Sequence, residues 1–504
     1  MKPRLVPLFL SLGWNFIPYV ITMAAGTHHF FWDADRFTPL CLLVLLLLGI
    51  LSRKLYSVSS LGLLAVNFMY VHIKYHWGMD LAESRFEAAM AGPTSETFEY
   101  AKIYFGSPEL AVLLHSVAAL FLIYRVFRSP SFPPAWRLWS FAMMIPLAVV
   151  LFLARESMAR FPPMSVVSDM LEAEAHLGQI AARESFIHNT QSEARSCSEG
   201  YEKIVIVIGE SAVRDRMSLY GYPEKTTPFL DSLNPWHFNG IAAANQTRYA
   251  VPQLLTRATV RNFNAFFHSQ SLVSELKECG YETYWISNQG GLGVNETYIT
   301  SIASEADHRS FLQSLDYVKT EYDGKLIDTL AKMGTARGRK QAFFIHLRGS
   351  HFDYRERYPV ESAMKPGGSI SSEYDNSIFY TDRVLSGIFH QFESDGLLFA
   401  YASDHGEVVS EQFYGHGFVP AFREEYRIPF VVWTAKKERI DTVRSILGEG
   451  ILNSESFNPL MEYLVGLDNR PDLSSSTLVL DVSPGNIVDY EKLANAIRVS
   501  PATR

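Results

Sequence analysis

The chain has 504 residues, a formal net charge of -8 and 13% aromatic residues. This acidic balance leaves no basic footprint of the kind that nucleic-acid-binding proteins carry. Apolar residues are unevenly distributed, because five long apolar runs fall within the first 155 residues. The rest of the chain alternates short apolar segments with polar ones, which is typical of a soluble α/β domain.

The apolar runs predict membrane-spanning helices. A span needs about 20 mostly apolar residues, so the second run must borrow from its flanks. The first run lacks the small-residue cleavage site of a signal peptide and is therefore expected to be retained. Residues 1–155 are predicted to form a five-helix transmembrane bundle from these runs: Leu5–Ala25, Phe37–Leu51, Leu55–Tyr75, Pro108–Phe127 and Trp136–Ala154.

The charges of the short loops predict the orientation of this bundle. Lysine and arginine concentrate on one side, which becomes the cytoplasmic side. Five spans then place the carboxy-terminal domain on the opposite side of the membrane. The alternative, that these runs are core helices of a large soluble protein, fits poorly with the tract LCLLVLLLLGIL (residues 40–51).

A connector, residues 156–201, precedes the domain. Its segment MLEAEAHLGQIAARESF (170–186) has apolar residues at helical spacing among many charges. This pattern predicts an amphipathic helix that lies on the membrane interface, on the domain, or in solvent as a plain connector. Cys197 in the connector and Cys279 in the domain are positioned so that they can pair in an oxidising compartment, and the sequence leaves this pairing open.

Residues 202–504 are predicted to form an α/β domain with a mostly parallel sheet and helices on both faces. Lys203–Ile208 is a continuous apolar run, as expected of a central parallel strand. Ligands of such sheets bind beyond the carboxyl ends of the strands. Further strands are predicted at Thr283–Ser287, Ala342–Leu347, Leu397–Ala402 and Pro429–Trp433, and helices at Leu272–Glu278 and Ser377–Phe392.

Carboxylate and imidazole side chains gather at or just beyond the ends of these strands. Both are ligands that Zn²⁺ takes in proteins. An adjacent Asp-His pair at one strand end, with a glutamate and further histidines at others, predicts a metal site. The residues are Glu210, His346, His351, Asp404, His405 and His416.

A metal with carboxylate ligands at the tip of an α/β sheet suits phosphoryl or sulfuryl transfer, and a hydroxyl near it is the expected nucleophile. Thr247 lies near a predicted helix start, where backbone N–H groups favour a phosphate. On chemistry alone, Ser211, Thr256 and Thr259 compete with Thr247 for the role of nucleophile. The structural alternative for each of these residues is a helix cap.

Several motifs resemble one known family when taken together and in order. They are IGESAVRDRMSLYGYPEKTTPFL (208–230), TRYAVP (247–252), GSH (349–351), YDNSIFYTD (374–382), SDHGE (403–407) and GHG (415–417). These segments resemble the phosphoethanolamine transferases of Gram-negative inner membranes, which belong to the alkaline phosphatase and sulfatase superfamily. That family also has five spans ahead of a periplasmic catalytic domain, so the resemblance covers essentially the whole chain.

The resemblance implies roles for individual residues. Glu210, Thr247, Asp404 and His405 would bind the catalytic zinc, with Thr247 as the nucleophile. His351 and His416 would help to bind the phosphoryl group or a second zinc ion, so the expected cofactor is one Zn²⁺ or two. The remaining implied site residues are His346, the substrate-loop residues Asn288 and Gln289, and Glu96, which would hold the ammonium of the donor lipid.

The function implied by the resemblance is transfer of phosphoethanolamine from phosphatidylethanolamine through a phosphoethanolamine-threonine intermediate. The implied location is the bacterial inner membrane, multi-pass, with the catalytic domain in the periplasm. The acceptor stays open among lipopolysaccharide core, lipid A and osmoregulated glucan. The alternatives are a membrane-anchored phosphatase or sulfatase-type hydrolase, a glycerol-phosphate transferase, and a non-catalytic assembly partner that keeps the fold.

Overall fold

The computed structural model describes most of the carboxy-terminal two thirds of the chain and part of the rest. Its chain divides into two compact units, an N-terminal unit (Met1–Met90 and Glu96–His176) and a C-terminal unit (Ala91–Ser95 and Leu177–Arg504). The described residues are 5–15, 42–64, 107–153, 182–190, 194–289, 294–312, 321–333, 338–411, 413–418, 420–448 and 450–496.

Helices occupy each of the five apolar runs in the N-terminal unit. They cover residues 5–15, 42–51, 53–64, α6 (Ser107–Arg128) and α7 (Pro134–Leu153). Polar side chains tie them together: the Trp14 indole donates to the His115 carbonyl at 3.0 Å, and the Ser140 hydroxyl donates to the Leu47 carbonyl at 2.6 Å. Within the stretches that the structure describes, no helix combines the length and the apolar character needed to cross a membrane.

The C-terminal unit is built on one large sheet. Its strand order is β10-β2-β9-β6-β1-β5-β3-β4, and β9 runs antiparallel to its neighbours β2 and β6, while the other pairs are parallel. The strands are β1 (Lys203–Gly209), β2 (Trp236–Ile241), β3 (Glu282–Ser287), β4 (His308–Phe311), β5 (Gln341–His346), β6 (Leu397–Ser403), β9 (Arg427–Thr434) and β10 (Ile451–Asn453).

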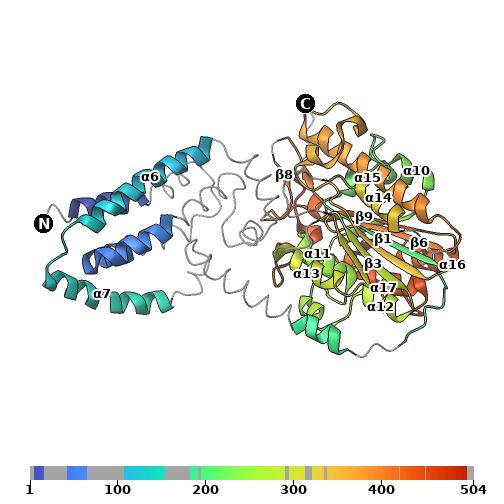
Figure 1. Ribbon diagram of the computed structural model, residues 1–504, viewed down its shortest axis with the longest axis horizontal. Helices are drawn as coiled ribbons and strands as arrows, with labels where there is room; N and C mark the ends of the chain where they lie inside the picture. Colours follow the sequence, from blue (N-terminus) through green and yellow to red (C-terminus); the bar gives the residue numbers. More distant parts are fainter. Residues whose placement is uncertain are drawn as a thin grey trace. The chain divides into compact units, whose positions relative to one another are not determined.

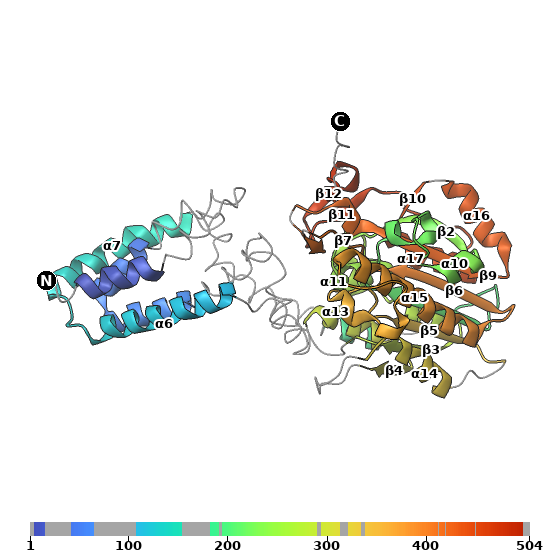
Figure 2. The same ribbon diagram turned by 90° about the horizontal axis from the view of Figure 1, so that it is seen from above.

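Helices cover both faces of this sheet, as Figures 1 and 2 show. Alternate residues of β1 point to opposite faces, so Ile204, Ile206 and Ile208 join one core while Val205 and Val207 join the other. The first core takes α11 (Thr247–Leu255), α12 (Leu272–Glu278), α13 (Val294–Ala303), α16 (Lys437–Leu447) and α17 (Phe457–Val465). The second takes α10 (Pro228–Leu233), α14 (Gly324–Met333) and α15 (Ile370–Phe392).

The predicted α/β class is confirmed, with a mostly parallel sheet. All five predicted strands are present, and the two predicted helices correspond to α12 and the greater part of α15. Strands β2, β4 and β10 were not predicted. Their short, half-polar sequences, such as WHFNGI in β2, carry too weak an apolar pattern to stand out.

The helix formed by residues 182–189 is the described part of the predicted connector helix, and it docks on the C-terminal unit. Its Arg183 is completely buried and pairs with Glu305 at 2.5 Å. The same guanidinium donates to the Ser301 hydroxyl and the Phe266 carbonyl, at 2.7 and 2.9 Å. A buried charge is tolerated when it is fully hydrogen-bonded. These contacts fix the helix firmly on the domain.

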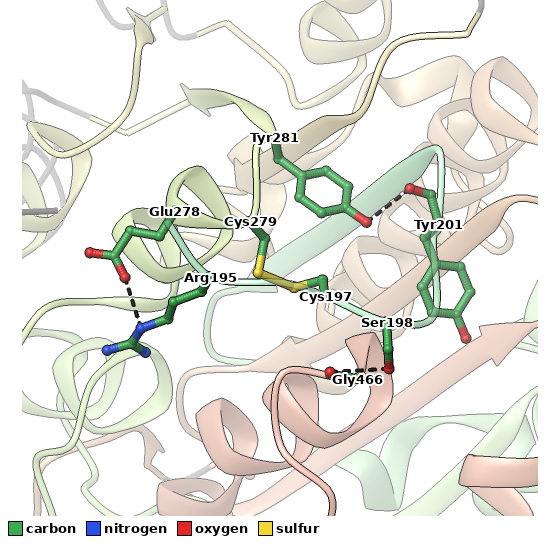
Figure 3. The surroundings of a disulfide bond; sticks show 8 residues. All are labelled: Arg195, Cys197, Ser198, Tyr201, Glu278, Cys279, Tyr281 and Gly466. Atoms are coloured by element: carbon green, nitrogen blue, oxygen red, sulfur yellow. Dashed lines mark hydrogen bonds and ion pairs between the residues drawn. A yellow bond between two sulfur atoms is a disulfide. The ribbon is translucent and has the colours of Figure 1, made fainter. Parts of the chain in front are cut away.

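A disulfide bond between Cys197 and Cys279 closes the start of the domain (Figure 3). It joins the segment before β1 to the end of α12, with a Cα–Cα distance of 5.5 Å and a sequence separation of 82 residues. Neighbouring bonds reinforce it, since Arg195 pairs with Glu278 at 3.0 Å and the Ser198 hydroxyl donates to the Gly466 carbonyl at 3.2 Å. The pairing that the sequence left open is therefore present.

A buried carboxyl pair lies between α12 and α17. Glu275 and Glu462 both contact Arg257, which follows α11. Burial, followed by the charge of Glu462, raises the pKa of Glu275 to about 8 from its ordinary value of 4.5. Because the folded state holds this proton to a higher pH than the unfolded chain does, the pair stabilises the fold in acid and loses that contribution as the pH rises from 4.5 through 8.

We expect loss of the disulfide to destabilise the C-terminal unit. Cys197→Ser combined with Cys279→Ser should lower the free energy of unfolding by about 4 kcal/mol, because a bond across such a long loop restricts the unfolded chain. Chemical denaturation of the full-length protein in detergent, followed by circular dichroism, measures this. Reductant should shift the wild-type midpoint and leave the double variant unchanged. An unshifted wild type would contradict the prediction.

We expect Glu275→Gln to stabilise the protein above neutral pH. The amide cannot ionise, so the variant should escape the loss of up to about 1.4 kcal/mol per pH unit that the wild type undergoes between pH 4.5 and 8. Denaturation midpoints at pH 5, 6.5 and 8 test this. The denaturation midpoint of Glu275→Gln should rise relative to that of the wild type as the pH increases. The midpoint of Glu361→Gln, a substitution at an exposed position, should not. Parallel curves for Glu275→Gln and the wild type would refute the assignment.

Candidate metal and nucleophile site

The carboxyl ends of four neighbouring strands meet at one edge of the sheet. In the register of the strands, His346 lies opposite both Ile208 and Ser287, and Gly209 lies opposite Ser403. The next residues along the chain after these strands are therefore brought together. They include Glu210 after β1, Asp404 and His405 after β6, and Asn288 and Gln289 after β3.

Glu210, Asp404 and His405 form a tight, buried group. Their ligand atoms lie within 4.8 Å of one another, and each side chain is at most 1% exposed. His405 Nε2 is 3.3 Å from both Glu210 Oε1 and Asp404 Oδ2. Three of the four residues to which the resemblance gives zinc ligation are thus adjacent in space.

Ser211 holds two of these side chains in place. Its backbone N–H donates to Asp404 Oδ1 at 3.1 Å, and its hydroxyl donates to Glu210 Oε1 at 2.8 Å. Ser211 adopts a left-handed conformation, with φ at 56°, which is unfavourable for a residue with a Cβ atom. The Tyr374 hydroxyl secures this turn because it donates to the Ser211 carbonyl at 2.6 Å and accepts from the Val213 N–H at 2.9 Å.

The loop after β5 approaches the turn at Glu210 and Ser211 so closely that it requires a glycine. Gly349, after β5, has φ at 54°, and a Cβ atom there would lie 2.6 Å from the carbonyl oxygen of Glu210. The GSH motif (349–351) therefore brings its backbone against the ligand loop in a way that no other residue permits. Ser350 N–H also donates to the Glu210 carbonyl, at 2.9 Å.

Thr247 completes the group from a different element. It is the first residue of α11, as predicted, and its hydroxyl lies 3.1 Å from Glu210 Oε2 and 3.2 Å from His405 Nε2. Unlike the other three residues, Thr247 is partly exposed. Thr247 therefore reaches the boundary of the buried group, while the supporting side chains stay covered.

The competing hydroxyls are placed elsewhere. Ser211 is fully buried. Thr256 caps the far end of α11, where its hydroxyl donates to the Pro252 carbonyl at 2.6 Å. The Thr259 hydroxyl accepts from the Asn262 N–H in a turn. Of the four candidates, Thr247 alone has both contact with the buried group and access from outside.

The donor set fits a zinc ion. The Gly406 carbonyl lies 2.9 Å from His405 Nδ1, so Nδ1 donates there and Nε2 is the ring nitrogen that faces the carboxylates and that a metal ion would take in place of a proton. Asp404 Oδ2 is buried and accepts no hydrogen bond from the described residues. Two carboxylates, one imidazole and one hydroxyl are ligand types suited to Zn²⁺, and an orphaned carboxylate oxygen is what a cation would satisfy.

The electrostatics of the group also favour a cation. Burial, followed by the charge of Glu210, raises the pKa of Asp404 to about 7. Burial opposes charge on His405, but the carboxylates of Asp404 and Glu210 outweigh it and raise its pKa to about 10. Two carboxylates thus share a space where only part of their charge is neutralised by the protein, and a bound divalent ion would supply the rest.

His346 and Gln289 lie beside Glu210. The Gln289 amide nitrogen is 3.2 Å from Glu210 Oε2 and 3.1 Å from His346 Nε2. Burial lowers the pKa of His346 to about 4, so its ring is neutral and accepts from the amide. Asn288 points elsewhere, since its amide donates to Asp323 Oδ1 at 2.8 Å and to the Glu321 carbonyl at 2.9 Å. Of the two predicted substrate-loop residues, the structure brings only Gln289 to the metal ligands.

His416 and His351 lie next to His405 in turn. The ring of His416 lies 4.0 Å from that of His405 and 5.8 Å from that of His351, measured between centroids. The buried carboxylate of Glu407 binds His416 Nδ1 at 2.7 Å and accepts from the Tyr354 hydroxyl at 2.6 Å. His351 Nδ1 is 2.6 Å from the Phe352 carbonyl. Nδ1 is thus engaged in both histidines, by the Phe352 carbonyl in His351 and by Glu407 in His416.

Some assignments fall outside this description, and some residues were not anticipated. Glu96 lies outside the described residues. Tyr374 and Glu407 stand in the YDNSIFYTD and SDHGE motifs, but the sequence analysis gives neither a role. Tyr374 acts through the backbone of Ser211 and Val213, and Glu407 acts through the ring of His416, and a sequence does not show such contacts. Their positions inside the two motifs are the one sequence signal for a role. Glu407 forms a second group of possible ligands with His405 and His416.

Comparisons with known proteins agree with this geometry. Residues 202–446 match the family model described as Sulfatase. The chain is 26% identical over 454 residues to phosphoethanolamine transferase EptC of Escherichia coli K12, covering 80% of this chain and 78% of the relative.

Two solved structures are similar as well. The zinc complex of the periplasmic domain of Escherichia coli EptC has a TM-score of 0.52 and 26% identity, over 59% of this chain and 95% of that one. The integral membrane protein lipooligosaccharide phosphoethanolamine transferase A of Neisseria meningitidis has a TM-score of 0.61 over 94% of this chain and 96% of that one, with 17% identity, so it supports the fold alone. Residues 202–446 of the chain are therefore similar to the Sulfatase family, and the chain as a whole is similar to proteins named phosphoethanolamine transferases.

Proposed function

We propose that this protein is a zinc-dependent phosphoethanolamine transferase that takes phosphoethanolamine from phosphatidylethanolamine and passes it to a periplasmic glycolipid or glycan. The observation that carries the proposal is the position of Thr247. Its partly exposed hydroxyl meets Glu210 and His405 inside a buried ligand group. The similarity to EptC over most of the chain supports the same reaction class.

The zinc ligands in this proposal are Glu210, Thr247, Asp404 and His405. When bound, the ion would lower the pKa of the threonine hydroxyl and neutralise charge on the phosphoryl oxygens. The protein orients this chemistry itself: the Gly406 carbonyl fixes the tautomer of His405, and Ser211 fixes both carboxylates. The number of ions, one or two, depends on whether Glu407, His405 and His416 also bind a metal.

The reaction has two steps on Thr247. In the first, Thr247 Oγ attacks phosphorus, the bond from phosphorus to the glycerol oxygen breaks, and the proton of Oγ ends on that oxygen to give diacylglycerol. In the second, an oxygen of a hydroxyl or phosphate of the acceptor attacks the phosphorus, the bond from phosphorus to Oγ breaks, and the proton of the acceptor oxygen ends on Oγ. The intermediate lets two large substrates use the site in turn.

Other residues steer the phosphoryl group. The first N–H groups of α11 are oriented to meet phosphate oxygens, because Thr247 is the first residue of that helix. His351 and His416 are the proposed contacts of the phosphoryl oxygens, and Glu407 sets the orientation of His416. Glu96 is retained as the proposed partner of the ethanolamine ammonium, and Gln289 acts by holding Glu210.

We propose a multi-pass protein of the bacterial inner membrane with residues 1–155 in the bilayer, residues 156–201 as connector and residues 202–504 in the periplasm. The five apolar runs and the loop charges support this arrangement. The disulfide between Cys197 and Cys279 supports an oxidising compartment for the catalytic domain. The acceptor is a lipopolysaccharide core, lipid A or an osmoregulated glucan.

We expect Thr247→Ala to abolish transfer. After incubation of the full-length protein with phosphatidylethanolamine and zinc, intact mass analysis should show an adduct of about 123 Da, as a covalent phosphoryl-enzyme requires, on the wild type and not on the variant. Thr256→Ala serves as the matched control and should keep the adduct. Free phosphoethanolamine without any adduct would favour a hydrolase, and turnover of glycerol-phosphate lipid alone would favour a glycerol-phosphate transferase.

Removal of zinc should stop adduct formation, and its return should restore it. Asp404→Asn should lower the bound zinc at least tenfold, because it removes a charged ligand from a buried site, whereas Thr247→Ala should keep most of it. Metal content of dialysed protein, measured by elemental mass spectrometry, checks both. Equal zinc in Asp404→Asn and the wild type would refute Asp404 as a ligand.

A further inference from the structure

Three phenylalanine side chains form an apolar cluster in the segment that follows Asp404 and His405 in the chain. Phe413, Phe418 and Phe422 contact one another in a triangle, with ring centroids separated by 5.7, 5.6 and 5.6 Å. Phe413 is 36% exposed, and the other two are half-buried. We call this cluster the phenylalanine triad. Contiguous exposed apolar surface can serve as a ligand-binding site.

The triad is attached to the hairpin that carries His416. Strands β7 (Val408–Val409) and β8 (Tyr414–Gly415) pair antiparallel, and the Ser410 hydroxyl bonds the N–H and carbonyl of Phe413 at 3.1 and 2.5 Å. Phe413 therefore stands at the turn of this hairpin, and His416 follows its second strand.

A single buried carboxylate connects the triad to the nucleophile's segment. Glu425 accepts from the backbone N–H groups of Phe418 and Phe422, at 3.0 and 2.7 Å. It also accepts from the side-chain amide of Asn245 at 3.1 Å, two residues before Thr247. Its own carbonyl accepts from the Gly406 N–H at 2.7 Å, next to His405. The rings are thus held in a fixed relation to Thr247 and to the metal ligands.

Two charged residues next to the triad in the chain, Glu411 and Arg423, already have partners. Glu411 accepts from the N–H groups of Ile370 and Ser371 at the start of α15, at 3.2 and 3.1 Å. Arg423 donates to the carbonyls of Leu493 and Glu491. A sugar would need hydrogen-bonding partners beside the rings. An apolar ligand needs none, so the surface favours the lipid over the glycan.

We propose that the phenylalanine triad binds the acyl-glycerol part of the donor lipid. The proposal rests on the proposed function and extends it. Phosphatidylethanolamine carries its acyl chains a few bonds from the phosphorus. The triad is likewise connected to the segment of Thr247 through Glu425 and Asn245. Burial of the first methylene groups against the rings contributes to affinity for the lipid. The triad thereby distinguishes a diacylated donor from a free headgroup.

The test compares two donors in single-turnover formation of the phosphoethanolamine adduct on the full-length enzyme. One donor is dioleoyl phosphatidylethanolamine in detergent micelles, and the other is glycerophosphoethanolamine, which has the same phosphodiester and no acyl chain. Phe413→Ser should lower kcat/KM for the lipid about tenfold through KM, as expected for a partly buried apolar side chain. The rate with glycerophosphoethanolamine should stay at the wild-type value.

Two further variants complete the design. Phe413→Leu keeps apolar area without the ring and should keep the preference for the lipid. Ile446→Ser removes an exposed apolar side chain at the end of α16 and should change nothing. Zinc content and melting temperature confirm that each variant is folded.

Three results would overturn the proposal. The first is an unchanged donor preference in Phe413→Ser. The second is equal loss with both donors. The third is normal adduct formation with slow discharge to the acceptor, which would assign the rings to the glycan. Absence of any adduct on the wild type with either donor is a different outcome, because it rejects the proposed function itself.

Discussion

Two carboxylates buried side by side, Glu210 and Asp404, are the constraint on which the C-terminal unit depends. Like charges cannot share a dry space unless donors and a cation offset them. The protein provides donors from Ser211 and from the backbone of His405, and it leaves one oxygen of Asp404 without a donor among the described residues. The central strands, the left-handed turn at Ser211 and the close approach of Gly349 all serve to hold this pair.

The position of Thr247 follows from the same constraint. A nucleophile must touch the buried group and still meet a substrate, and the first residue of α11 satisfies both conditions because it contacts Glu210 and His405 and is partly exposed. Ser211 shows the alternative. It is also a hydroxyl in contact with Glu210, yet full burial restricts it to positioning the ligands.

Much of this arrangement is predictable from sequence because the strands are continuous apolar runs and the ligands follow them directly. The run ending at Ile208 places Glu210, and the run ending at Ala402 places Asp404, at the edge where parallel strands terminate together. The antiparallel direction of β9 and the weak strand β2 are not predictable, since neither has a local signal. The same limit applies to Asn288, whose partner Asp323 is 35 residues away in the chain.

The contrast between Glu425 and Asp404 explains how one edge of the sheet can serve a lipid as well as a metal. Glu425 is as buried as Asp404, but each of its oxygens accepts hydrogen bonds from protein donors. These donors offset its charge, and the bonds fix the backbone of Phe418 and Phe422. Asp404 keeps an oxygen for a cation. Glu425, whose oxygens are hydrogen-bonded, can therefore hold the backbone of the apolar phenylalanine triad in the same domain as Asp404. A donor with a charged phosphate and an apolar tail requires these two environments within one molecule's length.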